Sequence, residues 1–211
     1  MLRLVPVVIL TILIGPVVAG LAGIVAPALG WLPVLGGTTV TAHWFEQAAM
    51  APGFGASVWL SYWTGLATTA VALLLVTLFL AGWWGTRNFD RVAAFTAPLF
   101  AVPHAAAAIG LAFLVAPSGW IVRVLSPWLT GFDRPPDWLI INDPAGLTLL
   151  AGLVIKEMPF LLLMALAALP QAGAPRRIRA ARSLGYGRVW GWLTAVFPSV
   201  YAQIRLPVYA V

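Results

Sequence analysis

Long apolar stretches separated by short polar ones dominate the sequence. A helix of about 20 residues spans the roughly 30 Å of a bilayer's hydrocarbon core, and four stretches reach that length. They are Leu4 to about Ala28, about Val58 to Trp83, about Ala93 to Val115 and about Ala145 to Leu169. A fifth begins at Pro198 and is too short to span by Val211. The pattern predicts an all-α, polytopic transmembrane bundle, one domain over residues 1–211, with four complete spans and a fifth truncated at its C-terminus.

The first apolar stretch is predicted to be a retained helix with its amino end in the cytoplasm. Its one charge, Arg3, precedes an apolar run that continues towards Leu35. That run exceeds the core of a signal peptide, which has about 7 to 15 apolar residues. A cleaved signal peptide is the alternative, because Val18, Ala19 and Gly20 are small residues suited to cleavage.

The polar stretches between the spans predict which side of the membrane each connection occupies. Gly36–Gly55 and Ser118–Pro144 have loop compositions without a basic excess, so we expect both outside. Within the second, Ser118–Leu129 is predicted to be an interfacial helix under its own tryptophans. Thr86–Arg91 is predicted to be a short cytoplasmic turn, since short loops that carry arginine stay inside.

The third span is predicted to be a bent helix packed inside the bundle. Pro98 and Pro103 interrupt it, and membrane helices tolerate proline where neighbours satisfy the freed carbonyl groups. His104 follows the second proline. A histidine at this depth either lines a translocation path or forms a hydrogen bond to a neighbouring helix.

The fourth span carries two adjacent charges, Lys156 and Glu157, near its middle. A charge at the bilayer centre costs several kcal/mol, so such residues face protein or a water-filled cavity. Adjacent residues of a helix point about 100° apart and cannot form a same-face ion pair. At least one of the two therefore needs a partner on another helix. Two interpretations remain open: a gate or translocation-path pair, with His104 as a third candidate, or a structural pair that locks helices together.

Composition agrees with a membrane protein. Hydrophobic residues make up 62% of the chain and charged residues only 9%, whereas soluble domains have about a quarter of their residues charged. The net charge of +6 does not indicate nucleic-acid binding, because the basic excess lies in one loop beside a span. The chain has no cysteine, which excludes disulfides, thiol catalysis and thiolate metal sites.

That basic loop lies between the fourth and fifth apolar stretches and is predicted to face the cytoplasm. Its basic residues are Arg176, Arg177, Arg179, Arg182 and Arg188. Pro175 suits a first helical turn, Ile178, Ala181 and Leu184 recur every three residues, and Gly185 suits a helix end. We expect a short helix, a glycine break, and then a second helix that bends into the membrane at Pro198.

Part of this loop carries a family resemblance. Arg179-Ala180-Ala181 is followed after three residues by Gly185 and, after nine more, by Ala195-Val196-Phe197-Pro198. The arrangement resembles the cytoplasmic signature of binding-protein-dependent ABC importer permeases, written E-A-A, three residues, G, nine residues, I-x-L-P. The two alanines, the glycine, the proline and both spacings match. Arg179 stands where the family has glutamate, which puts the polar contact of that position in doubt, and two apolar residues near the proline also differ.

The resemblance implies an inner-membrane permease of a bacterial type I importer, multi-pass, with a coupling helix between spans four and five that docks on an ATPase. It implies these partners: ATP-binding cassette subunits, a periplasmic or extracellular solute-binding protein, a second permease half and the lipid bilayer. Fused double permeases of the thiamine and ferric-iron type share this form, so the chain resembles their amino-terminal part. The residues implied in coupling are Arg176, Arg177, Arg179, Ala180, Ala181, Arg182 and Gly185.

Motifs for catalysis are missing from the sequence. No phosphate-binding G-x-x-x-x-G-K-[ST] loop occurs, so ATP hydrolysis would need a separate subunit, and no metal-binding H-E-x-x-H or G-x-S-x-G nucleophile motif occurs. We therefore predict a chain that is not itself an enzyme and holds no cofactor or metal. The alternative is an ATP-independent secondary transporter or integral membrane enzyme with a proton-linked set of Lys156, Glu157 and His104. A structural scaffold is a third possibility.

Overall fold

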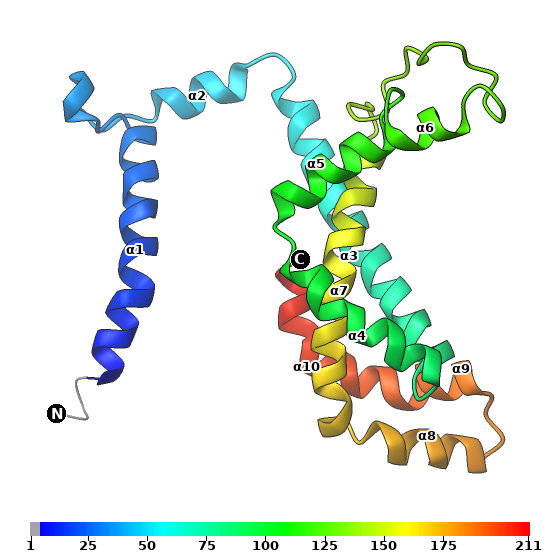
Figure 1. The fold of residues 1–211 in the computed structure, drawn as a ribbon. Coiled ribbons are helices and arrows are strands. Elements are labelled where there is room, and N and C mark those ends of the chain that lie inside the picture. Colours follow the sequence, from blue (N-terminus) through cyan, green and yellow to red (C-terminus); the bar gives the residue numbers. More distant parts are fainter. Residues whose placement is uncertain (1–4) are drawn as a thin grey trace. The chain divides into compact units, whose positions relative to one another are not determined.

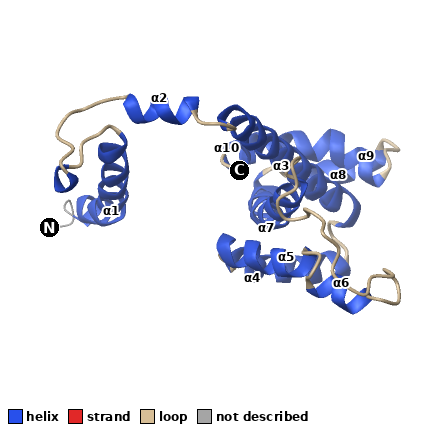
Figure 2. Ribbon diagram, turned by 90° about the horizontal axis from the view of Figure 1, so that it is seen from above, coloured by secondary structure: helices blue, strands red, loops and turns tan. Residues whose placement is uncertain are grey.

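The computed structural model describes residues 5–211, and this part of the chain consists of helices and loops without a strand (Figures 1 and 2). It divides into two compact units, Met1–Trp59 and Leu60–Val211. The expectation of a single domain stays a prediction. The helices are α1 (Val5–Ala28), η1 (Pro33–Leu35), α2 (His43–Met50), α3 (Phe54–Trp83), α4 (Arg87–Ala101), α5 (His104–Val115), α6 (Trp120–Leu125), α7 (Leu147–Gln171), α8 (Ala174–Ser183), α9 (Arg188–Gly191), η2 (Trp192–Val196) and α10 (Phe197–Tyr209).

The first unit contains one apolar helix and a short amphipathic one. α1 is apolar on all sides and buries none of its side chains, as expected for a helix surrounded by lipid. The predicted start at Leu4 and the charge of Arg3 lie outside the described residues. The prediction of an irregular loop over residues 36–55 was wrong in part, because α2 forms there. The Gln47 amide lies 3.0 Å from the His43 imidazole one turn away, a local contact that supports this helix.

The core of the second unit lies where α3, α7 and the segment from η2 to α10 meet. On α3 the buried side chains recur every four residues and include Ala72, Val76 and Leu80. The segment from η2 to α10 has a buried stripe with the same spacing. Its residues are Trp192, Val196, Val200, Ile204 and Val208. The second stripe packs against α7, and the α3 stripe belongs to the same buried cluster as the leucines and alanines of α7. Small residues at these contacts let helices approach closely, which drives association inside a membrane.

The predicted third span is two helices. α4 begins at Arg87, within the stretch predicted as a turn, because Thr86 caps it: the Phe89 amide donates to the Thr86 hydroxyl over 3.2 Å. The helix ends at Ala101, and α5 begins at His104 after Pro103. Pro103 does more than bend the chain, since it separates two helices that run in different directions (Figure 1). The prediction that this span packs inside the bundle was also wrong for α5, none of whose residues is buried.

Four stretches of the described chain are long and apolar enough to cross a membrane, which indicates an integral membrane protein. They are Val5–Ala28, Phe54–Trp83, His104–Leu125 and Leu147–Gln171. The third differs from the prediction, because it covers α5 and α6 instead of residues 93–115. α6 forms within the predicted interfacial helix but is shorter than expected. Seen from above, α4 and α5 lie along one side of α7 and α10 along another (Figure 2).

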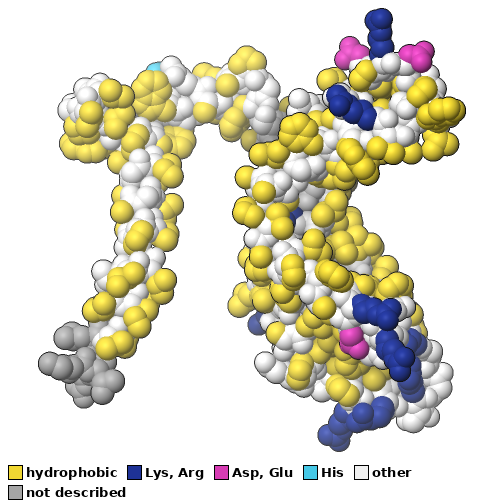
Figure 3. Space-filling view, viewed as in Figure 1, with side chains coloured by type: hydrophobic (Ala, Val, Ile, Leu, Met, Phe, Trp, Pro, Cys, Tyr) yellow, Lys and Arg dark blue, Asp and Glu magenta, His cyan; other side chains and the backbone are white. Residues whose placement is uncertain are grey.

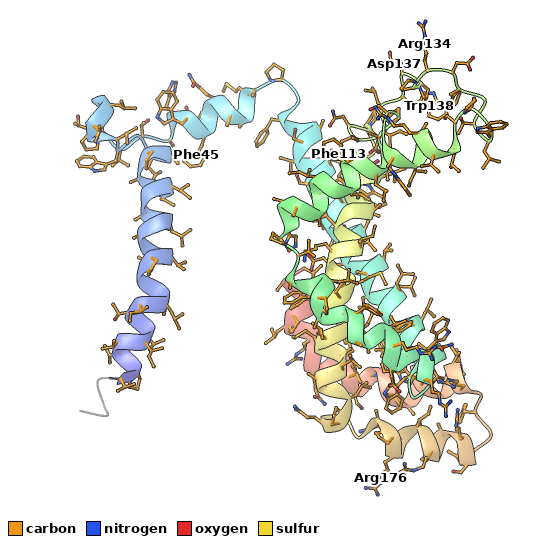
Figure 4. All side chains as sticks on the ribbon, in the orientation of Figure 1. Phe45, Phe113, Arg134, Asp137, Trp138 and Arg176 are labelled. Carbon is orange, nitrogen blue, oxygen red and sulfur yellow. The ribbon has the colours of Figure 1, made fainter. Side chains whose placement is uncertain are left out.

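Charge separates the two ends of the second unit. Arginines gather at the end that holds α8 and the turn between α3 and α4 (Figure 3). They are Arg87, Arg91, Arg176, Arg177, Arg179, Arg182 and Arg188, and Asp90 is the acidic residue of that end. The opposite end, with α6 and the loop after it, mixes two arginines with Asp133, Asp137 and Asp143. Figure 4 labels Arg176 at one end and Arg134, Asp137 and Trp138 at the other.

Candidate functional site

The short basic helix predicted from the sequence is α8, and glycines in the left-handed region bound it on both sides. Gly173 precedes it with φ of 61°, and Gly185 follows it with φ of 83°. At its end the Tyr186 amide donates to the Ala181 carbonyl over 3.1 Å and the Gly185 amide donates to the Arg182 carbonyl over 3.0 Å. This double hydrogen bond needs a left-handed residue, which glycine adopts without strain. The predicted glycine break is therefore present.

α8 presents one face to the molecule and the other to its surroundings. Its inner face packs against α9 and η2 through Ala174, Ile178 and Ala181. A side-chain carbon at Gly191 would lie 3.2 Å from the Ala181 Cβ atom, so both small residues serve close packing within the chain. Ala180 and Gly185 are exposed. Of the two alanines in the signature, one is used internally and one lies on the free face.

The predicted coupling arginines divide in the same way. Arg176, Arg179 and Arg182 are exposed on α8. Arg177 is also exposed, but its Nε atom donates to the Ala172 carbonyl over 2.9 Å and so helps to satisfy the C-terminal end of α7. Arg188 begins α9 and donates to the Trp84 carbonyl over 2.6 Å, which ties the α8–α9 loop to the turn after α3.

Lys156 lies on α7 with only 7% of its surface exposed, and it caps the C-terminal end of α4. Its ammonium group donates to the Phe100 carbonyl over 2.9 Å and to the Leu99 carbonyl over 3.5 Å. The Leu99 carbonyl would normally accept the amide of residue 103, but Pro103 has none. The Leu99 carbonyl accepts the Val102 amide over 3.4 Å instead, and the lysine adds a second donor there. Its positive charge faces the negative end of the α4 dipole. It also lies 5.6 Å from the centre of the Phe100 ring, within cation–π range.

Glu157 contacts the other half of the broken helix. His104 Nε2, at the start of α5, lies 3.2 Å from Glu157 Oε1, and the imidazole is the donor because a carboxylate accepts. The His104 side chain is 66% exposed and that of Glu157 is 17% exposed. A carboxylate also suits the positive, N-terminal end of α5.

The two adjacent charges therefore have different partners. Lys156 holds the end of α4 and Glu157 holds the start of α5, so each half of the break is fixed to α7 separately. The prediction that at least one charge finds a partner on another helix is confirmed. This geometry agrees with the structural interpretation of the pair. The translocation-path interpretation stays a prediction.

A groove of about 370 Å³ runs between α5 and α7 beside these residues. Its walls are mostly apolar, with small alanines on α5 and Leu149 and Leu153 on α7. His104 and Lys156 lie at its polar end. Gly152 lets the two helices approach, because a side-chain carbon there would lie 3.0 Å from the Leu111 Cδ2 atom. The three path candidates named from the sequence are thus brought together at one break, next to one groove.

Asp143 was not singled out from the sequence, although it positions the start of α7. Its carboxylate accepts from the Leu147 amide over 2.6 Å and from the Thr148 amide over 3.1 Å. These backbone hydrogen bonds lower the pKa of Asp143 below its ordinary value of 3.8, and the bond from Thr148 has the larger effect. An aspartate a few residues before a long apolar run is a helix-start signal that could have identified it.

No protein-family model, curated protein or solved structure matches the chain. The functional argument therefore depends on the residues and their geometry.

Proposed function

We propose that this chain is the membrane-spanning permease subunit of a bacterial ABC importer and that α8 is its contact with the ATPase. The chief support is α8 itself: a short helix at one end of the second unit, bounded by left-handed glycines, with an exposed arginine face. Both signature spacings end at features that agree with the proposal, since Gly185 terminates α8 and Pro198 lies in the first turn of α10.

The proposed mechanism uses the connections of α8. Because α8 follows α7 after two residues and packs against η2, a displacement of the helix would move α7 and α10 with it. An ATPase that grips α8 differently in its two nucleotide states would thereby bias the membrane helices between outward and inward access. The excess of arginine at this end supports a cytoplasmic α8 in the inner membrane, with the amino terminus on the same side.

The proposal is tested by changing the left-handed glycine that ends α8. The chain would be co-expressed with ATP-binding subunits encoded beside its gene, and the amount of co-purified subunit measured with the ATPase rate in proteoliposomes. Gly185→Val forces a β-branched residue into the left-handed region at a cost of about 1–2 kcal/mol. We expect co-purification to fall by about tenfold.

Gly131→Val is the matched control. Gly131 has φ of 70°, and a side chain at Gly131 or Gly185 would meet no atom within 4 Å, so the backbone strain is comparable. Gly131 lies at the opposite end of the second unit, and its variant should keep the ATPase bound. Equal behaviour of the two variants, or assembly and transport that survive Gly185→Val, would refute the docking geometry.

A second candidate function is favoured by one observation, the His104–Glu157 hydrogen bond beside the groove. An ATP-independent transporter would use this ionisable pair, with Lys156, to couple uptake to a proton gradient. Uptake that follows an imposed proton gradient without ATP, and no ATPase in the purified complex, would favour this function over the first.

A further inference from the structure

A cavity of about 300 Å³ lies where α3, α8 and the α9–η2 segment meet. Arg179, Arg182 and Arg188 line one part of it. Apolar side chains, among them Leu80 and Ile178, line another. The cavity thus joins a strongly basic surface to an apolar one.

The position of this cavity matches the depth of lipid headgroups. α3 is a candidate membrane span that ends at Trp83. The cavity is lined by Leu80 from the last turn of that span and by Trp84 just after it. Tryptophan near the end of a span is typical of the membrane–water interface. If α3 spans a membrane, the cavity lies at the boundary between the hydrocarbon core and water.

The arginines of the cavity are not neutralised within the described chain. Over residues 5–211, none of the three has a carboxylate oxygen within 4.0 Å, since the one ion pair found there joins His104 to Glu157. Arg188 donates to the Trp84 carbonyl, which leaves its charge intact. Arg179 adds positive charge at the position where the family resemblance expects a negative one. An anion is the complementary ligand.

A buried donor without a partner lies beside the cavity. Trp192 also lines the cavity, and it is only 1% exposed. Its indole N–H group is buried and finds no acceptor among the residues that the structure describes. A buried donor without a partner costs about 1–3 kcal/mol, and this nitrogen is covered by the chain, so it stands beside the cavity as an unsatisfied core group.

We propose that this cavity binds the phosphate headgroup of an anionic phospholipid. The phosphate oxygens would accept hydrogen bonds from the guanidinium groups of Arg179 and Arg182. The acyl chains would follow the apolar wall along α3. Basic pockets between membrane helices hold anionic headgroups in this way. A soluble anion is disfavoured because the cavity opens at the end of a span. Arg179 and Arg182 also belong to the face proposed to contact the ATPase. The test uses the chain without an ATPase, so lipid binding is measured separately from the proposed function.

Lipid-dependent thermal stability tests this site. The full chain in detergent micelles would receive phosphatidylcholine or phosphatidylglycerol, and its unfolding midpoint would be followed by size-exclusion chromatography. A ligand that binds only the folded state raises the midpoint, and we expect phosphatidylglycerol to raise it by about 4 °C more than phosphatidylcholine. The double variant Arg179→Ala/Arg182→Ala should lose most of this difference.

Arg87→Ala/Arg91→Ala is the matched control, because it removes two positive charges from the same end outside the cavity. Unspecific attraction of anionic lipid predicts equal losses for the two double variants, and that outcome would overturn the site. Sodium phosphate is a further arm. A full shift with inorganic phosphate alone would identify an ion site instead of a lipid site. No shift with lipid, together with loss of the ATPase from the arginine variant, would assign the cavity to an acidic partner side chain.

Native mass spectrometry of bound lipid gives an independent readout. We expect fewer phosphatidylglycerol adducts for Arg179→Ala/Arg182→Ala than for Arg87→Ala/Arg91→Ala. Equal adduct counts in the two double variants would refute the proposal.

Discussion

α4 and α5 are two halves of one interrupted apolar stretch, and they are held very differently. α4 buries Phe89 and Thr96 and receives a buried lysine at its end. α5 buries none of its residues and is joined to α7 by the half-exposed His104–Glu157 pair and by packing over Gly152. The interrupted stretch therefore has a fixed half and a weakly attached half. The groove lies against the weakly attached one.

The largest expected effect comes from removing the buried cap of α4. Lys156→Met takes away the donor for the Phe100 carbonyl, and a membrane interior offers no water to replace it. We expect a loss of about 2 kcal/mol in the free energy of unfolding, measured by urea titration in micelles. Lys156→Arg keeps donor and charge and should lose less than half of that. A Lys156→Met variant as stable as the natural chain would show that burying the charge costs as much as its hydrogen bonds provide.

A smaller effect is expected where α5 approaches α7. Gly152→Leu would push against the Leu111 side chain and separate the two helices, with a cost of about 1–3 kcal/mol for a rigid contact. Because α5 is weakly attached, we expect the lower end of that range and a large change in distance between spin labels on the two helices. Gly110→Leu on α5 meets open space and is the control. Equal distances in both variants would mean that α5 does not rest on Gly152.

The smallest effect concerns the start of α7, next to the same groove. Asp143→Ala should lower the unfolding midpoint at neutral pH because it removes the acceptor for two amides. The folded-state pKa is lowered, so the contribution of the carboxylate is complete above its ordinary pKa of 3.8 and declines as the pH falls through the folded value. The difference from the natural chain should therefore be constant from about pH 5 upward and shrink below about pH 3.8. A difference that grows on acidification would contradict this assignment.

Local chemistry made parts of the fold predictable from the sequence. α8 was predicted because Pro175 and Gly185 influence only the helix turn next to them, at its start and its end. The candidate spans α1, α3 and α7 were predicted from their long apolar runs. The divergent directions of Lys156 and Glu157 followed from helix geometry alone. Their partners did not, because the Phe100 carbonyl on α4 and His104 on α5 are more than fifty residues away in the chain.

Where the sequence misled, tertiary contacts or short-range polar pairs decided the outcome. Pro103 indicated a bend, but the structure separates α4 from α5, and the carbonyls left at the end of α4 accept from Lys156 on α7. α2 was missed because the polar, glycine-flanked composition of residues 36–55 is typical of a loop, and the His43–Gln47 contact within it was not predicted. The basic cavity could not be foreseen at all, since Arg188 and Trp192 meet Arg179 only after the chain turns at Gly185.

The π-helical turn η2 has a consequence for motion. A π turn holds one more residue than an α-helical turn, and such turns often mark functional positions in helices. The additional residue allows the segment between α9 and α10 to change its length slightly. If the wide turn migrates by one position, α9 advances relative to α10 while the backbone only exchanges one set of amide partners for another. A displacement of α9 could thus be accommodated within η2 while α10 stays helical.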